Sequence, residues 1–179
     1  MEQKNIFAIS GSLRLGSSNH AILQALGKMI PSNITYTIFN GMSEIPAFDP
    51  GLDNDEPPAA VTTFRNKISE ADAIIICTPE YAFGVPGQLK NMLDWLVSSS
   101  SLVDKPVMLV TASSQGQYAH ESLQLTLGAL TAKLSEETNL LIPFIRSKMD
   151  SEGNIVDKVV KENLKKSFSH FVKSVLSKN

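Results

Sequence analysis

The residues best suited to chemistry lie in a polar segment, residues 10–19, that follows an apolar run near the N-terminus. The segment reads Ser-Gly-Ser-Leu-Arg-Leu-Gly-Ser-Ser-Asn. Glycines let a backbone bend sharply and approach a ligand, and backbone N–H groups at the start of a helix bind anions. The hydroxyls of Ser12, Ser17 and Ser18 can donate hydrogen bonds, and Arg14 can add a charge-assisted contact. The segment is therefore a candidate phosphate site.

The spacing of the glycines limits which class of phosphate-containing ligand the segment can bind. Gly11 and Gly16 are spaced as in a P-loop, but Ser17 stands where a P-loop has its lysine, which disfavours a magnesium-bound triphosphate. The pattern also differs from the G-x-G-x-x-G of dinucleotide-binding folds. A terminal monophosphate is the favoured ligand. Alternatively, Ser17, Ser18 and Asn19 only cap the following helix, although capping still leaves N–H groups for a ligand.

A second candidate segment, residues 78–87, combines a stiff backbone with aromatic side chains: Thr-Pro-Glu-Tyr-Ala-Phe-Gly-Val-Pro-Gly. Prolines stiffen both of its ends, and two glycines permit close approach of a ligand. Such a loop suits a flat heterocycle, which needs hydrogen bonds at its edge and apolar contact on its face. The alternatives are that Glu80 is an ordinary loop carboxylate and that Tyr81 and Phe83 pack against another subunit.

A third polar segment, residues 111–118, reads Thr-Ala-Ser-Ser-Gln-Gly-Gln-Tyr. Its amides and hydroxyls could bond the edge of a ring, or Ser113 or Ser114 could simply cap a helix. Signals of protein-borne catalysis are weak, since the histidines lack metal-ligand spacing and no G-x-S-x-G motif is present. We therefore expect no catalytic side chain and no metal site, and a cofactor that carries the chemistry.

Short apolar runs and helical patterns alternate along the chain, and these elements must position the three polar segments. The expected strands are residues 5–9, 34–39, 71–77, 107–112 and 140–145, and apolar residues at helical spacing predict a helix after each of them. Five strands alternating with five helices indicate a parallel sheet covered on both faces, which makes the fold class α/β.

The composition of the strands suggests their order in the sheet. The strand at 71–77 is almost wholly apolar, as central strands are. The strand at 34–39 alternates, and that at 140–145 contains Pro143, so both suit the edges. A flavodoxin-like order of 2-1-3-4-5 fits this pattern. Ligands then bind beyond the carboxyl ends of the first and third strands, where the first two polar segments begin.

Length and composition limit the class of protein. With 179 residues, 42% of them hydrophobic, we expect one domain over residues 1–179. The net charge of −2 gives no electrostatic reason for binding nucleic acid or a membrane, and no apolar stretch approaches the ~20 residues of a membrane span. The chain shows no signal-peptide pattern, and its single cysteine excludes an intrachain disulfide. A cytoplasmic protein without nucleic-acid or membrane partners is expected.

Two of the segments together resemble the NADPH-dependent FMN reductases, a family that includes quinone, azo-dye and chromate reductases. Residues 11–19 resemble its G-S-x-R-x-x-S-x-N phosphate loop. Thr-Pro-Glu-Tyr at 78–81, followed by Pro-Gly-Gln-Leu-Lys-Asn-Met-Leu-Asp-Trp at 86–95, resembles its flavin-ring segment and interface helix. The resemblance implies a flavodoxin-like three-layer sandwich that binds FMN and uses NADPH or NADH as co-substrate.

The same resemblance assigns individual residues to the cofactor. The FMN phosphate would be held by Ser12, Arg14, Ser17, Ser18 and Asn19. The ring would contact Pro79, Glu80, Tyr81, Ala82, Phe83 and Gly84, and its far edge would be bordered by Ser113, Ser114 and Gly116. The family commonly has asparagine where this chain has Ala82. Its members usually form dimers or pairs of dimers, which implies a homodimer or homotetramer with the helix from residue 87 in the interface.

The predicted function is a ping-pong reaction. NADPH or NADH delivers hydride to the flavin, and a small-molecule acceptor such as a quinone, an azo compound, free flavin or a metal oxyanion then takes the electrons. Two alternatives stay open. One is a flavodoxin-like electron carrier that does not use a nicotinamide, which the near-neutral charge disfavours. The other is a non-catalytic module that binds a different phosphate ligand.

Overall fold

The computed structural model describes residues 3–177, so the predicted domain bounds of 1–179 extend beyond this range at both ends. Within residues 3–177, five strands form one parallel sheet in the order β2-β1-β3-β4-β5. The strands are β1 (Lys4–Ser10), β2 (Ile34–Phe39), β3 (Ala73–Thr78), β4 (Val107–Ala112) and β5 (Asn139–Ile142). The predicted flavodoxin-like strand order is confirmed.

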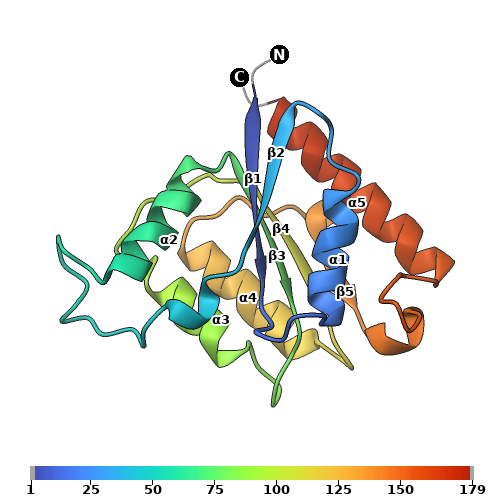
Figure 1. Ribbon diagram of the computed structural model, residues 1–179, viewed down its shortest axis with the longest axis horizontal. Helices are drawn as coiled ribbons and strands as arrows, with labels where there is room; N and C mark the ends of the chain where they lie inside the picture. The colour runs from blue at the N-terminus through green and yellow to red at the C-terminus, as the bar shows by residue number, and fades with distance from the viewer. Residues whose placement is uncertain (1–2, 178–179) are drawn as a thin grey trace.

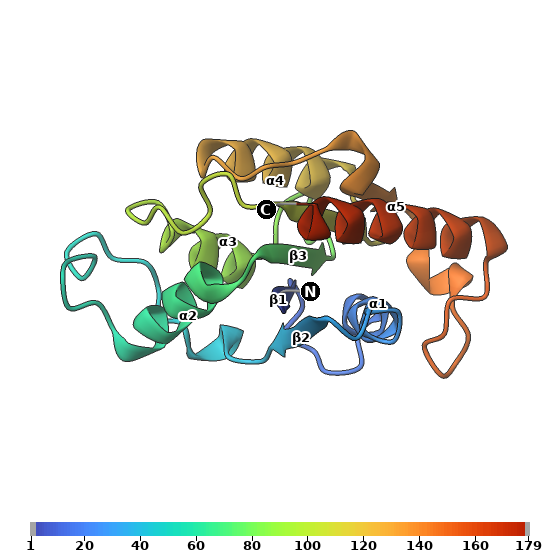
Figure 2. The ribbon, with the colours of Figure 1, turned by 90° about the horizontal axis from the view of Figure 1, so that it is seen from above.

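Helices cover both faces of the sheet, which gives the three layers expected from the alternating pattern. The α-helices are α1 (Ser18–Gly27), α2 (Ala59–Glu70), α3 (Gly87–Asp94), α4 (Gln117–Ala129) and α5 (Lys158–Leu176). Short 3₁₀ turns lie at η1 (Met42–Glu44), η2 (Glu136–Thr138) and η3 (Ile145–Lys148). Figure 2 shows α1 and α5 on one side of the sheet and α2, α3 and α4 on the other.

Alternation along the strands divides the apolar core into two halves. In β1, Ile6 and Ala8 pack with α1 and α5, whereas Phe7 and Ile9 pack with α2 and α3. Successive side chains of a strand point to opposite faces, so a strand buried on both sides has no polar face. All residues of β3 are buried for this reason. The sheet is therefore a rigid platform whose carboxyl edge positions the loops.

Several predicted element boundaries were wrong, and two of them have a clear local cause. The last strand ends at Ile142 instead of residue 145, because the next residue, Pro143, has no N–H to donate to the sheet. The chain then turns into η3. Leu123, Leu127, Leu130 and Leu134 recur at helical spacing and predict one helix through residue 134, but the helix ends at Ala129. Leu130 and Leu134 still pack on the core from the irregular segment that follows, so their spacing mimicked a longer helix.

No helix within residues 3–177 combines the length and the apolar character needed to cross a membrane. In the same part of the chain, no group of three or more histidine, cysteine or acidic side chains is arranged to hold a metal ion.

Candidate functional site

A pocket of about 720 Å³ lies at the carboxyl edge of the sheet. In Figure 1 this is the lower edge, toward which the strand arrows run. The pocket is lined by the segments that follow β1, β3, β4 and β5, and its volume is in the range of pockets that hold small molecules. The topology therefore brings together segments that are far apart in the sequence, as expected for a parallel α/β sheet.

Most of the residues predicted for the site line this one pocket: Ser12, Arg14, Ser17, Ser18, Asn19, Pro79, Glu80, Tyr81, Ser113 and Ser114. Four predicted residues are not among its lining residues, namely Ala82, Phe83, Gly84 and Gly116. The sequence reasoning missed Ala112 and the segment 144–147, which also line it. A topological signal for that segment existed, because residues after the last strand emerge at the same edge of the sheet.

The loop between β1 and α1 keeps donors available at the start of the helix. Ser17 is the N-cap of α1, and its hydroxyl accepts a hydrogen bond from the backbone N–H of His20 at 3.2 Å. Gly16 has a φ of +74°, which lets the chain reverse just before the cap. The backbone N–H groups of Ser18 and Asn19 have no acceptor within residues 3–177. Capping and anion binding are therefore compatible here.

Gly11 holds this loop against the end of β3. Its N–H donates to the carbonyl of Cys77 at 2.8 Å. A Cβ on Gly11 would lie 2.1 Å from Thr78 Oγ1, far inside any normal contact distance. Only glycine permits this approach, which keeps the loops after β1 and β3 next to one another.

The side chain of Asn19 is buried under the pocket. Its amide donates to the carbonyl of Ala112 at 3.3 Å, and its carbonyl oxygen accepts from the Cys77 thiol at 3.3 Å. Burial raises the pKa of the Cys77 thiol well above its usual range, so the thiol stays protonated and can serve as the donor. Asn19 thus joins α1 to the ends of β3 and β4.

The loop after β3 contains a tight hairpin turn. Tyr81 and Gly84 exchange two backbone hydrogen bonds of 3.0 Å, and the two central residues, Ala82 and Phe83, both have positive φ, +48° and +58°. This is the pattern of a type I′ turn, which favours asparagine or glycine in its centre. The backbone thus accounts for an asparagine at position 82 in the related motif. The Phe83 ring packs edge-on against Tyr118, with centroids 5.3 Å apart.

Glu80 connects the second loop to the third. Its carboxylate accepts hydrogen bonds from the backbone N–H groups of Gly116 at 3.2 Å and Ala119 at 2.9 Å. Its own N–H donates to Ser113 Oγ at 3.0 Å. Both carboxylate oxygens are therefore engaged at the start of α4, and the backbone N–H and carbonyl of Glu80 are both bonded to the Ser113 hydroxyl.

The segment after β5 is fastened to the third loop. Phe144 donates its N–H to the carbonyl of Ser114, and Ile145 donates to the carbonyl of Ser113, both at 3.1 Å. Phe144 has a φ of +54°, an unfavourable conformation for a bulky residue, and its side chain is 62% exposed. These bonds hold an aromatic ring and the following residues at the pocket.

The charges that remain unpaired in the pocket are positive. Arg14 and Arg146 both line it, and neither guanidinium forms an ion pair or a hydrogen bond with another described residue. The carboxylate that lines the pocket belongs to Glu80 and is engaged by backbone donors. With hydroxyls and open N–H groups beside Arg14, the arrangement suits an anion at the start of α1.

Comparison with known proteins identifies one family and relatives with reductase names. A family model described as NADPH-dependent FMN reductase matches residues 4–144. A quinone reductase of Escherichia coli K12 is 30% identical over 184 residues, covering 97% of this chain and 98% of that protein. An NAD(P)H-dependent FMN reductase of Pseudomonas aeruginosa is 31% identical over 163 residues, covering 88% and 87% of the two chains.

Among solved structures, the fold is similar to that of FerB, a flavoenzyme NAD(P)H:(acceptor) oxidoreductase from Paracoccus denitrificans. The two superpose with a TM-score of 0.82, covering 96% of this chain and 97% of that one, at 23% sequence identity. At this identity the likeness establishes the fold, which is that of a flavodoxin-like protein.

Proposed function

Since the chain belongs to the NADPH-dependent FMN reductase family, we propose that it transfers electrons from NADPH or NADH to a quinone or a similar small acceptor by a ping-pong mechanism. In the net reaction the nicotinamide loses a hydride, and the quinone gains two electrons and two protons, the second proton coming from solvent. The observation that carries the proposal is the pocket at the carboxyl edge of the sheet, where unpaired N–H donors and Arg14 lie beside the loops after β3 and β4.

The chemistry of the pocket fits FMN at both ends of that molecule. The phosphate needs several donors and a positive charge, and the start of α1 offers free N–H groups, serine hydroxyls and a guanidinium. The close approach of Gly11 to Thr78 keeps this phosphate end next to the loop after β3. The ring needs polar backbone at its edge and a rigid wall, which the fastened loops at Glu80 and Ser113 supply.

At the phosphate end, we assign the charged contact to Arg14 and the hydroxyl contacts to Ser12, Ser17 and Ser18. The N–H groups of Ser18 and Asn19 add donors at the positive end of the α1 dipole. The Asn19 side chain acts indirectly, because its amide is used to join α1 to β3 and β4.

At the ring end, we assign the contacts to the backbone carbonyl groups of residues 79–81, whose N–H groups are absent or already engaged, and to Ser113 and Ser114. Ala82, Phe83 and Gly84 would act through the shape of the turn, and Gly116 through its bond to Glu80. Tyr81 is 58% exposed at the mouth of the pocket, where it can contact a planar substrate. Bound FMN would supply the redox chemistry, accepting hydride from the nicotinamide and returning electrons to the acceptor.

We expect a ping-pong order because the nicotinamide and the acceptor would enter the pocket through the same opening, one after the other. The nicotinamide product must leave before the acceptor can reach the same face. We propose a quinone as acceptor because a relative that covers 97% of this chain is named a quinone reductase, with azo compounds, free flavin and metal oxyanions as competing candidates.

We also propose a homodimer or homotetramer located in the cytoplasm. Exposed apolar side chains next to α3 and on α4 support association, since Val97, Val103 and Leu125 are 68%, 49% and 78% exposed. Sedimentation of the purified protein tests the assembly.

The test of the function is an anaerobic absorption spectrum of protein loaded with FMN and freed of excess, before and after NADPH or NADH. We expect retained flavin bands that bleach promptly with at least one nicotinamide and recover when a quinone is added. Retained bands that bleach with neither nicotinamide would identify an electron carrier instead. Protein that never takes up FMN would reject the proposal.

A further inference from the structure

The segment Phe144–Ser147 lines the pocket and lies at or beyond the last residue matched by the family model, residue 144. Because it follows β5, it approaches the pocket from the side opposite the loop after β1. What it binds rests on the function proposed above.

This segment presents an aromatic ring at the pocket. Phe144 is held in a left-handed conformation by its bond to Ser114, and the Ser147 hydroxyl donates to the Phe144 carbonyl at 2.8 Å. Strained residues persist where the surrounding structure fixes them, and they are concentrated at functional sites. Tyr81 lines the same pocket and is also more than half exposed. A planar aromatic molecule is the ligand that such rings would contact.

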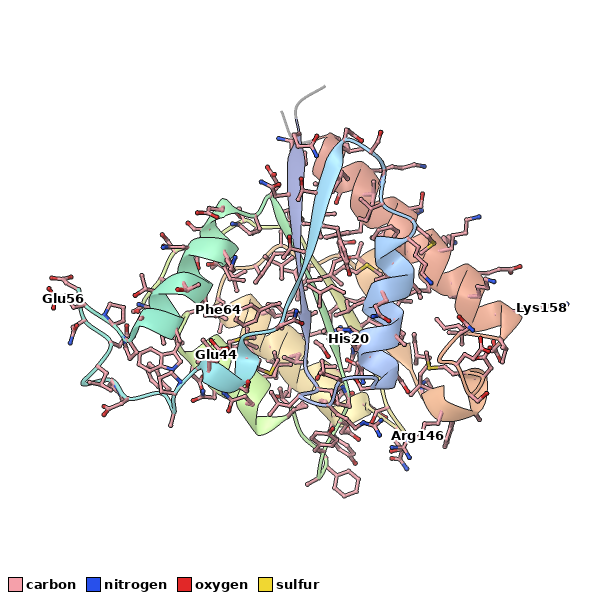
Figure 3. The ribbon with its side chains drawn as sticks, in the orientation of Figure 1. His20, Glu44, Glu56, Phe64, Arg146 and Lys158 are labelled. Carbon is pink, nitrogen blue, oxygen red and sulfur yellow. The ribbon has the colours of Figure 1, made fainter. Side chains whose placement is uncertain are left out.

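The segment also presents a positive charge. Arg146 is exposed and lines the pocket, and no other described residue forms an ion pair or a hydrogen bond with its guanidinium. Figure 3 shows it at the lower edge of the molecule, below α1. The Glu80 carboxylate, which could have neutralised it, is engaged at the start of α4.

The pocket therefore carries two guanidinium groups, which follow different strands. Arg14 lies in the loop after β1 with the serine hydroxyls and N–H groups, whereas Arg146 lies after β5, two residues beyond the exposed Phe144, which lines the same pocket. A guanidinium next to an aromatic surface recognises a planar molecule with a negatively charged substituent.

We propose that Phe144 and Arg146 recognise the electron acceptor, and that the preferred acceptor is a planar aromatic molecule bearing a carboxylate or sulfonate group. The ring of the acceptor contacts Phe144, and its anionic group pairs with Arg146. This contact selects among acceptors without taking part in electron transfer.

The test measures binding of two nearly isosteric, non-reducible probes to the FMN-loaded protein: naphthalene-2-sulfonate and the neutral naphthalene-2-sulfonamide. We expect calorimetry to show that the sulfonate binds about tenfold more tightly, as one charge-assisted hydrogen bond implies. Arg146→Gln should bring the ratio of the two affinities close to one, and Arg146→Lys should restore part of it. Phe144→Leu should weaken both probes alike.

The matched control is Lys148→Gln, which removes the same charge from the same 3₁₀ turn at a residue that does not line the pocket. This variant should keep the parental affinity ratio, which separates a specific contact from a general loss of positive charge. Equal affinities of the parent for the two probes would overturn the proposal. So would an equal effect of the Arg146 and Lys148 substitutions.

Titration of each variant with FMN separates this proposal from the function on which it rests. Failure of the parent to bind FMN rejects the proposed function. Normal FMN binding by the parent but a tenfold loss in Arg146→Gln assigns Arg146 to the phosphate and rejects only the acceptor site. The acceptor site is also rejected if Arg146→Gln raises the KM for NADPH but leaves the ratio of the KM values for an anionic and a neutral quinone unchanged.

Discussion

The Glu80 carboxylate accepts a 2.9 Å hydrogen bond from the backbone N–H of Ala119, which connects the loop after β3 to the first turn of α4. The helix that contains Ala119 begins at Gln117, and its N-cap residue, Gly116, has no side chain with which to cap it. Glu80 therefore caps α4 from the loop after β3. One carboxylate thereby holds together the two loops that border the pocket.

We predict that Glu80→Ala lowers the free energy of unfolding by about 1–2 kcal/mol, because the first turn of α4 loses its cap. FMN affinity should fall as well, since the two loops are no longer fastened. Urea denaturation and FMN titration measure the two effects. Glu80→Gln, which keeps one acceptor oxygen, should be intermediate. As a control, Glu121→Gln removes a carboxylate from the exposed side of the same helix and should change neither the free energy of unfolding nor the FMN affinity. A Glu80→Ala variant that is as stable as the parent and binds FMN as tightly would contradict the capping role.

The turn at Ala82 should respond to substitution according to its backbone conformation. A residue with a Cβ pays about 1–2 kcal/mol in the left-handed region, and asparagine adopts it more readily than alanine. Ala82→Asn should therefore raise the free energy of unfolding by a few tenths of a kcal/mol. Ala82→Val should lower it, because a branched side chain is poorly tolerated at positive φ. Urea denaturation of both variants is the measurement, and equal stabilities of the two would argue against the type I′ turn.

Removing the Arg14 guanidinium should weaken FMN binding. We expect Arg14→Ala to lose ~1.5–3 kcal/mol of binding free energy, the range for a hydrogen bond to a charged group. Flavin fluorescence titration gives the dissociation constant, and higher salt should reduce the difference between the variants. Lys67→Gln, which removes an exposed charge from α2, serves as the control. If Arg14→Ala retained FMN as tightly as the parent, the phosphate would have to bind elsewhere.

Much of the fold could be predicted because the apolar pattern of each strand matches the position of that strand in the sheet. The near-continuous apolar run in β3 identified the central strand, and alternation in β2 identified an edge. The phosphate loop was recognisable because glycine, serine and arginine at that spacing serve a backbone geometry that few other residues permit.

The parts that sequence did not predict depend on contacts between distant residues. Nothing local to Glu80 indicates that its carboxylate will cap a helix that begins more than thirty residues later. The contribution of Phe144 and Arg146 was missed for a similar reason, since Pro143 ends the strand and redirects the chain. Asn19 was assigned to the phosphate from its place in the motif, whereas its side chain joins three elements.

Stability should depend on pH through His120, whose ring lies at the start of α4 and is only 9% exposed. Its Nδ1 lies 2.8 Å from Thr111 Oγ1. Burial lowers the pKa of His120 below its ordinary value, an effect that the nearby charge of Glu121 partly opposes. The unfolded chain therefore binds a proton more readily than the folded protein. The stabilisation is complete above the unfolded pKa of about 6.5 and is lost as the pH falls below it.

We therefore predict that the free energy of unfolding falls between pH 7.5 and pH 5.5, with a contribution from His120 of at most about 1.4 kcal/mol per pH unit. His120→Gln should be less stable at pH 7.5, because the buried contact with Thr111 is altered, but its stability should change less across this interval. Urea denaturation at several pH values measures both slopes. Identical slopes in the parent and the variant would mean that His120 binds a proton as readily in the folded protein as in the unfolded chain.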